Sequence, residues 1–176
     1  MDKVARKIAP AKWAPRSYLP QEAVGADALT GCLRTQTDAL SFWACNNDGS
    51  SLKDVVLALA CRFERPEKMH LVVLEMKALL DSGLEIEKTE GGTIVNDLRG
   101  RHRDVVHLSM EALCIIARLI AREVRAAEGH HVFSKAEVLD ILCTAVKQGR
   151  LSLDALGEKV REGLEKRSAD PPHFTA

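Results

Sequence analysis

The sequence predicts an α/β protein of the α+β type, with a mixed sheet of about five strands, flanking helices and an α-helical hairpin at the C-terminus. Three observations predict this class. Short runs with strand character occur up to residue 108, and amphipathic helical segments separate several of them. Beyond residue 108 apolar residues recur at three- and four-residue spacing, which is typical of helices. A chain of 176 residues is also long enough to bury a core without disulfide or metal support.

The chain divides into four predicted parts. Residues 1–26 form a basic N-terminal arm that prolines interrupt, and residues 27–129 form the α/β body. Residues 130–167 form the helical hairpin, which packs on the body, and residues 168–176 form a tail.

The arm contains two large aromatic residues, Trp13 and Tyr18. We expect them to anchor a protein partner, because aromatic residues are enriched among the residues that carry most of the binding energy of interfaces. The alternative is that they fix the arm to the protein's own body.

The first part of the body has the pattern of a β-hairpin followed by a helix. Two short apolar runs, Leu29–Arg34 and Leu40–Cys45, flank a polar turn. Ser51 can cap the amphipathic helix that starts at Leu52, and Pro66 follows the end of that helix.

The middle of the body alternates between strands and short connections. Met69–Leu74 is almost wholly apolar, which indicates a central strand covered on both faces. Met76–Asp81 is a short helix, and Leu84–Glu87 alternates as a half-exposed strand. The charged stretch 96–104 is a loop or a single helical turn, and Val105–Leu108 is the last strand.

The remaining elements are predicted to be helical. Ser109 can cap a helix over Met110–Ala127. Ser134 and Glu137 fit a capping box at the start of the next helix, and a further helix follows from Ser152. The last two helices form the C-terminal hairpin.

Composition narrows the classes of function. The 25 basic and 25 acidic residues and the pI of about 7.0 argue against a strongly basic nucleic-acid-binding domain. No apolar run approaches the roughly 20 residues that span a bilayer. Five cysteines without a C-x-x-C pair indicate a reducing compartment, so we expect a cytoplasmic protein. The few aromatic residues and the alanine-rich helical segments are typical of a bacterial protein. The sequence predicts no cofactor and no metal site.

One segment concentrates arginines in a predicted loop. We expect this segment, together with an arginine of the first hairpin, to bind a phosphorylated ligand, because guanidinium groups match phosphate oxygens in pairs. The four predicted ligand-binding residues are Arg34, Arg99, Arg101 and Arg103. His102 and Asp104 are the candidates for catalysis, with His102 as acid or base. The alternative, which the absence of a glycine-rich phosphate-binding motif favours, is a solvated loop whose arginines pair with Asp97 and Asp104.

The leading functional hypothesis is a non-catalytic protein-interaction component, either an accessory subunit or an immunity-like or antitoxin-like protein. It rests on the arm aromatics and on the absence of a recognisable catalytic motif. The alternative is an enzyme or sensor that binds a phosphorylated ligand such as a nucleotide through the arginine-rich loop. A nucleic-acid-binding accessory protein is the third hypothesis.

Overall fold

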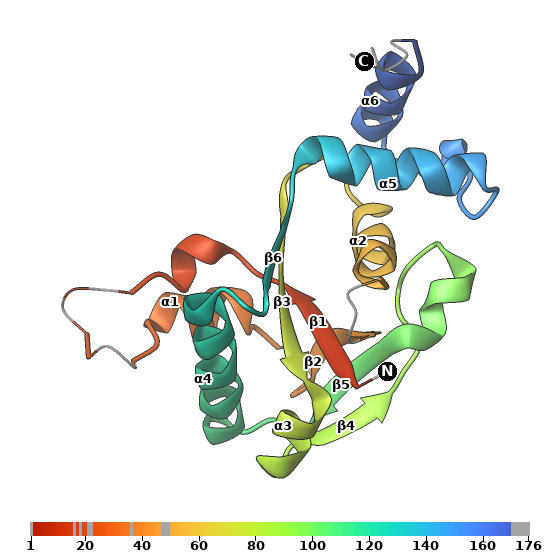
Figure 1. Ribbon diagram of the computed structural model, residues 1–176. Helices are drawn as coiled ribbons and strands as arrows, with labels where there is room; N and C mark the ends of the chain where they lie inside the picture. The colour runs from red at the N-terminus through yellow and green to blue at the C-terminus, as the bar shows by residue number, and fades with distance from the viewer. Residues whose placement is uncertain are drawn as a thin grey trace.

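The computed structural model describes residues 2–15, 17, 19–20, 23–35, 37–46 and 50–169. In this part of the chain the strands form one six-stranded antiparallel sheet in the order β4-β5-β2-β1-β3-β6 (Figure 1). The strands are β1 (Lys3–Lys7), β2 (Leu40–Cys45), β3 (Met69–Glu75), β4 (Glu85–Lys88), β5 (His102–Val106) and β6 (His130–Phe133). The α+β class is confirmed, but the sheet is antiparallel rather than mixed.

Helices lie on both faces of the sheet (Figure 1). The α-helices are α1 (Ala26–Cys32), α2 (Leu52–Ala60), α3 (Met76–Asp81), α4 (Met110–Ala126), α5 (Lys135–Lys147) and α6 (Glu158–Ala169). Short 3-10 helices are η1 (Pro10–Lys12), η2 (Asn96–Arg101) and η3 (Leu153–Ala155). No helix within the described residues combines the length and apolar character needed to cross a bilayer.

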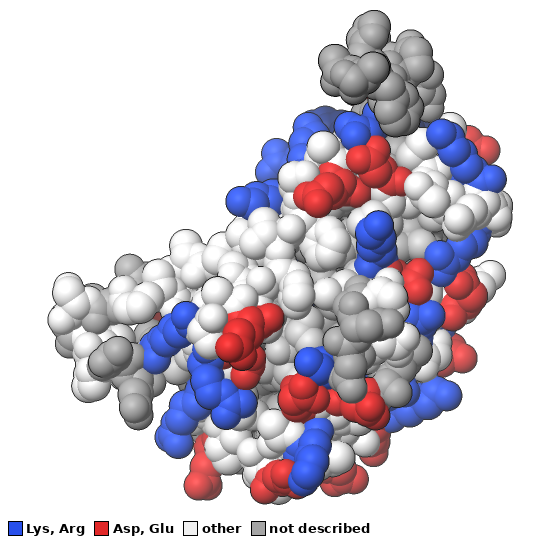
Figure 2. All heavy atoms as spheres, viewed as in Figure 1, with Lys and Arg blue, Asp and Glu red and all other residues white. Residues whose placement is uncertain are grey.

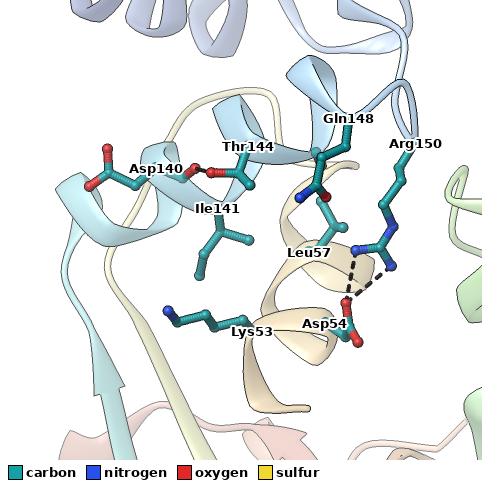
Figure 3. A pocket seen from close by; sticks show the side chains of 9 residues that line it. Lys53, Asp54, Leu57, Asp140, Ile141, Thr144, Gln148 and Arg150 are labelled. Atoms are coloured by element: carbon teal, nitrogen blue, oxygen red, sulfur yellow. Dashed lines mark hydrogen bonds and ion pairs between the residues drawn. The ribbon is translucent and has the colours of Figure 1, made fainter. Parts of the chain in front are cut away.

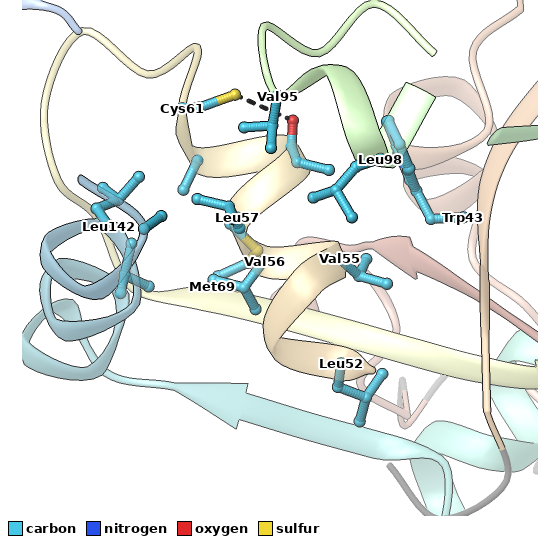
Figure 4. Close-up of a cluster of buried hydrophobic side chains, with 14 of the residues drawn as sticks. Trp43, Leu52, Val55, Val56, Leu57, Cys61, Met69, Val95, Leu98 and Leu142 are labelled. Carbon is cyan, nitrogen blue, oxygen red and sulfur yellow. Dashed lines mark hydrogen bonds between the residues drawn. The ribbon is translucent and has the colours of Figure 1, made fainter. Parts of the chain in front are cut away.

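Two hydrophobic cores form, one on each face of the sheet. On one face, α2, η2, α5 and α6 cover Trp43, Cys45 and Met69 (Figure 4). On the other, α1, α3 and α4 cover Leu40 and Phe42. Strand β2 therefore alternates between the two cores, as its two-residue period requires.

The N-terminal residues belong to the centre of the sheet, which corrects the prediction of a separate arm. Strand β1 pairs with both β2 and β3. Val4 and Ala5 are at most 1% exposed. The flanking charges stay near the surface, because Lys3 pairs with Glu75 at 2.9 Å and Lys7 pairs with Glu67. Only two of the five strand residues are apolar and fully buried, so the local signal for a strand is weak.

Residues 29–34, which we predicted to be the first strand of a hairpin, lie largely in helix α1. Ala28 and Leu33 are buried in the core under α4, and the Leu33 amide closes the helix on the Leu29 carbonyl. Because both side chains pack into the same core, a helix is stabilised here, although the short apolar run is compatible with either a strand or a helix. Leu40–Cys45 is a strand as predicted, but β2 pairs with β1 and β5.

The strong helix signals are confirmed. Ser134 and Glu137 form the predicted capping box, and Ser109 Oγ accepts the Ala112 amide at 3.1 Å at the start of α4. Helix α2 begins after Ser51, although Ser51 Oγ accepts the Asn46 amide and does not cap the helix.

Two strand predictions near the C-terminal half need correction. His130–Phe133 is an edge strand, β6, instead of the start of a helical hairpin, because it pairs with β3 and completes that side of the sheet. Strand β5 covers His102–Val106, and His107 has a positive φ of 54° that ends it. His102 and Asp104 consequently lie within the sheet, and not in a loop.

Candidate functional site

A hollow opens where strand β1 separates from strand β2, a place that we call the fork. The pairing between the two strands runs from Lys3–Cys45 to Ala5–Trp43. Beyond it β1 continues along β3 to Lys7, while the first residues of β2 pair with β5. The fork holds a hollow of about 480 Å³, which we call the Arg6–Arg34 hollow. It is lined by Arg6, Arg34, Thr35, Thr37, Ala39, Leu40, Ser41 and Asp104.

Arg6 occupies the fork. One terminal nitrogen of its guanidinium donates to the Ser41 carbonyl at 2.5 Å, and the other donates to the Cys32 carbonyl at 2.8 Å. The guanidinium lies 5.7 Å from the centre of the Phe42 ring. Burial lowers the pKa of Arg6 to about 10, so the group remains charged at neutral pH. Its buried Nε has no hydrogen-bond partner among the described residues.

Asp104 lies on β5 opposite Ser41 and accepts two hydrogen bonds. Ser41 Oγ donates to Oδ1 at 2.9 Å, and Thr89 Oγ1 donates to Oδ2 at 2.8 Å. The same Thr89 oxygen lies 2.7 Å from His102 Nδ1. A hydroxyl has one proton, and the Thr89 proton is directed to Asp104, so His102 Nδ1–H must be the donor to Thr89. The hydrogen bonds therefore run in one direction, from His102 through Thr89 to the carboxylate.

His102 is held in a partly buried position. Its ring meets the Trp43 indole edge to face, with centroids 5.2 Å apart. Burial lowers the pKa of His102, Asp104 opposes this, and Arg103 adds to it. His102 is thus neutral at pH 7 and is joined to Asp104 through Thr89, and its role as an acid or base stays a prediction.

The structure does not bring the four predicted ligand-binding arginines together. Arg34 lines the hollow, but Arg99, Arg101 and Arg103 do not. Arg99 Nε donates to the Thr93 carbonyl at 3.1 Å, and Arg101 pairs with Asp54 at 3.0 Å. Arg103 donates to the carbonyls of Gly100 and His102 at 3.1 and 2.6 Å. The alternative of a loop whose arginines pair with Asp97 and Asp104 is wrong as well, because Asp97 pairs with Arg150 and Asp104 accepts from Ser41 and Thr89.

A second pocket, of about 280 Å³, lies between α2 and α5 (Figure 3). Leu57 and Ile141 contribute apolar side chains to its lining. Arg150, at its edge, donates to Asp54 at 3.1 Å and to Asp97 at 2.6 Å. These contacts join α2, η2 and the end of α5, so the ionic groups here hold elements together.

The predicted partner-binding aromatics do not form an exposed pair. Trp13 is 2% exposed and belongs to the core under α1 and α4, which corrects its assignment as an anchor for a partner. Trp13 directly follows η1, and its side chain packs into the protein's own core. Tyr18 lies outside the described residues.

Charges of both signs are interspersed over the face of the molecule shown in Figure 2. The described residues contain one group with metal-ligand character, Glu85, Glu87 and His107, whose ligand atoms lie within 4.8 Å of one another. All three residues are exposed, and exposed acidic side chains on an edge strand commonly serve solvation.

Five polar residues of the site were not predicted from the sequence: Arg6, Thr35, Thr37, Ser41 and Thr89. Ser41 carried a usable signal, because it is a polar residue inside the otherwise apolar strand Leu40–Cys45. Arg6 and Thr89 carried none, since their roles depend on partners far away in the chain.

No family model matches this chain, and neither a curated protein nor a solved structure matches it, so the geometry of the hollow carries the functional proposal.

Proposed function

We propose that the protein binds a small phosphorylated ligand in the Arg6–Arg34 hollow and acts as a sensor of that ligand or as an enzyme on it. The observation that carries this proposal is that two arginines and three hydroxyl-bearing residues, Thr35, Thr37 and Ser41, line one hollow.

The two arginines differ in a way that suits anion binding. Arg6 is fixed by its two backbone carbonyls, so ligand binding costs little further ordering of that side chain. Arg34 is exposed at the rim and can close on a bound phosphate as a bidentate donor. The hydroxyls of Thr35 and Thr37 supply further donors to phosphate oxygens, whereas the single Ser41 proton is directed to Asp104.

Titration calorimetry and thermal unfolding with ribose 5-phosphate test the proposal. Saturating ligand at 100 times its Kd adds about 2.7 kcal/mol to the free energy of unfolding. We expect Arg34→Met to abolish this gain. Arg99→Met, which removes an equal charge from the arginine-rich segment, is the matched control and should keep it. Absence of binding, or equal loss in both variants, would overturn the proposal.

A second candidate is the protein-interaction component, and the edge strand β6 favours it. β6 ends the sheet, its four residues include no Lys, Arg, Asp or Glu, and Val132 is 45% exposed. An open edge of this kind can pair with an extended segment of a partner protein. We therefore keep an accessory subunit or an immunity-like or antitoxin-like protein as the alternative.

Native mass spectrometry of the protein purified gently from its source cells separates the two candidates. A stoichiometric protein companion that is lost in Val132→Lys supports the interaction candidate, because a charge at an edge strand discourages pairing. A retained small phosphorylated molecule and no companion supports the ligand-binding candidate.

We propose a cytoplasmic location because the cysteines are free thiols, as is usual in a reducing compartment. Cys32, Cys45, Cys61, Cys114 and Cys143 are free thiols in the structure. Burial raises the pKa of Cys45 to about 11, so that thiol is protonated and unreactive at neutral pH.

A further inference from the structure

We infer that the ligand of the Arg6–Arg34 hollow is a phosphate ester that carries a hydroxyl group, and that Asp104 accepts a hydrogen bond from that hydroxyl. This inference rests on the proposed function and names the class of ligand. Ribose phosphates are the representative members of the class.

Asp104 has acceptor capacity left over. An ionised carboxylate offers about four lone-pair positions. Ser41 uses one on Oδ1, and Thr89 uses one on Oδ2. The side chain is 18% exposed and lines the hollow, so the remaining positions are accessible to a ligand there.

The internal hydrogen bonds fix Asp104 as an acceptor. Ser41 and Thr89 both donate to it, and His102 supplies the donor behind Thr89. The hollow therefore presents two kinds of group, cationic donors at Arg6 and Arg34 and an anionic acceptor at Asp104.

This combination selects between phosphates. A phosphate ester without a hydroxyl group places its negative charge near the Asp104 carboxylate and offers no hydrogen-bond donor to it, so the two like charges repel. A phosphate ester with a hydroxyl can direct its anion to the arginines and its O–H to Asp104. A hydrogen bond to a charged group contributes more than a neutral one, so the hydroxyl should raise affinity clearly.

The experiment compares ribose 5-phosphate with methyl phosphate by calorimetry. Methyl phosphate has the same charged group and no hydroxyl. We expect wild type to bind ribose 5-phosphate at least about tenfold more tightly, which corresponds to about 1.4 kcal/mol. Because this comparison uses two ligands on one protein, it does not depend on the folding of a variant.

Asp104→Asn then assigns the preference to the carboxylate. We expect the ratio of the two affinities to fall to within about threefold, with methyl phosphate bound as tightly as before or more tightly, because the repulsion is gone. Asp81→Asn, which neutralises an exposed carboxylate on α3 far along the chain, is the matched control and should leave the ratio unchanged.

The outcomes separate this inference from the proposed function. Equal affinities of the two esters for wild type, with binding lost in Arg34→Met, would leave the proposed function standing and overturn the inference. An unchanged ratio in Asp104→Asn would overturn it as well. Absence of binding of either ester would overturn the proposed function itself.

Discussion

Two groups of arginines in this protein have opposite fates. The arginine-rich segment, which holds Arg99, Arg101 and Arg103, is the densest in the sequence, yet its guanidinium groups bind the protein's own carbonyls and the Asp54 carboxylate. Arg6 and Arg34 are 28 positions apart and line a common hollow. The arginines of this segment find acceptors within the protein, at Thr93, Gly100, His102 and Asp54, whereas the hollow lies where two strands diverge.

The protein uses arginine side chains in two ways to join its elements. Arg6 bridges β1, β2 and the end of α1 through backbone carbonyls. Arg101 and Arg150 bridge η2, α2 and the end of α5 through one carboxylate, Asp54. Both arrangements join elements, but only the first borders the fork.

The largest effect is expected for Arg6→Met. The change removes two charge-assisted hydrogen bonds to carbonyls and is partly offset by apolar packing of the methionine on Phe42, so we expect a loss of about 2–4 kcal/mol in the free energy of unfolding. Urea denaturation measures it. A loss below about 0.5 kcal/mol would show that Arg6 does not hold the fork together.

A smaller loss is expected for Asp54→Asn. Arg101 and Arg150 would then face each other without their shared carboxylate, and since all three groups are partly exposed we expect about 1–2 kcal/mol, less at high salt. Asp81→Asn, which breaks an exposed pair with Lys77, should cost at most about 0.5 kcal/mol. If the two changes lowered the free energy of unfolding equally, Asp54 would contribute no more to stability than an exposed ion pair does, which would contradict its role in joining these elements.

Acid should lower the stability of the fold at His102. Burial lowers the pKa of His102 in the folded state, so the unfolded chain binds more protons once the pH falls below about 6.5, and the free energy of unfolding decreases. His70 and His131 add to the same trend, because burial lowers the pKa of each of them too.

The dependence can be assigned by substitution. Chemical denaturation from neutral pH to about pH 5 should show a shallower decrease in His102→Gln than in wild type. The same decrease in both proteins would mean that protonation of His102 costs the folded state nothing.

The smallest effect on stability is expected for Arg34→Met. Arg34 is exposed at the rim of the hollow, so its removal should change the free energy of unfolding by no more than about 0.5 kcal/mol. The same variant should lose binding of ribose 5-phosphate. The two variants together distinguish Arg6, which stabilises the fold at the hollow, from Arg34, which binds the ligand. A large loss of stability in Arg34→Met would contradict this distinction.

Local signals in the sequence determined much of the fold. The capping box at Ser134 and Glu137, the cap at Ser109 and the apolar run at Met69–Leu74 each gave the right element, because capping, periodicity and continuous apolar character are properties of neighbouring residues. The buried stripe of α2 followed from its spacing in the same way.

Only the tertiary structure decided the place of β1, the helical state of α1 and the existence of the hollow. Arg6 meets carbonyls that lie 26 and 35 positions along the chain, and Asp104 meets Ser41 across 63 positions. These contacts follow from which strands pair and where the pairing stops. Pairing is settled by the simultaneous burial of both faces of the sheet, a condition that no short stretch of sequence expresses by itself.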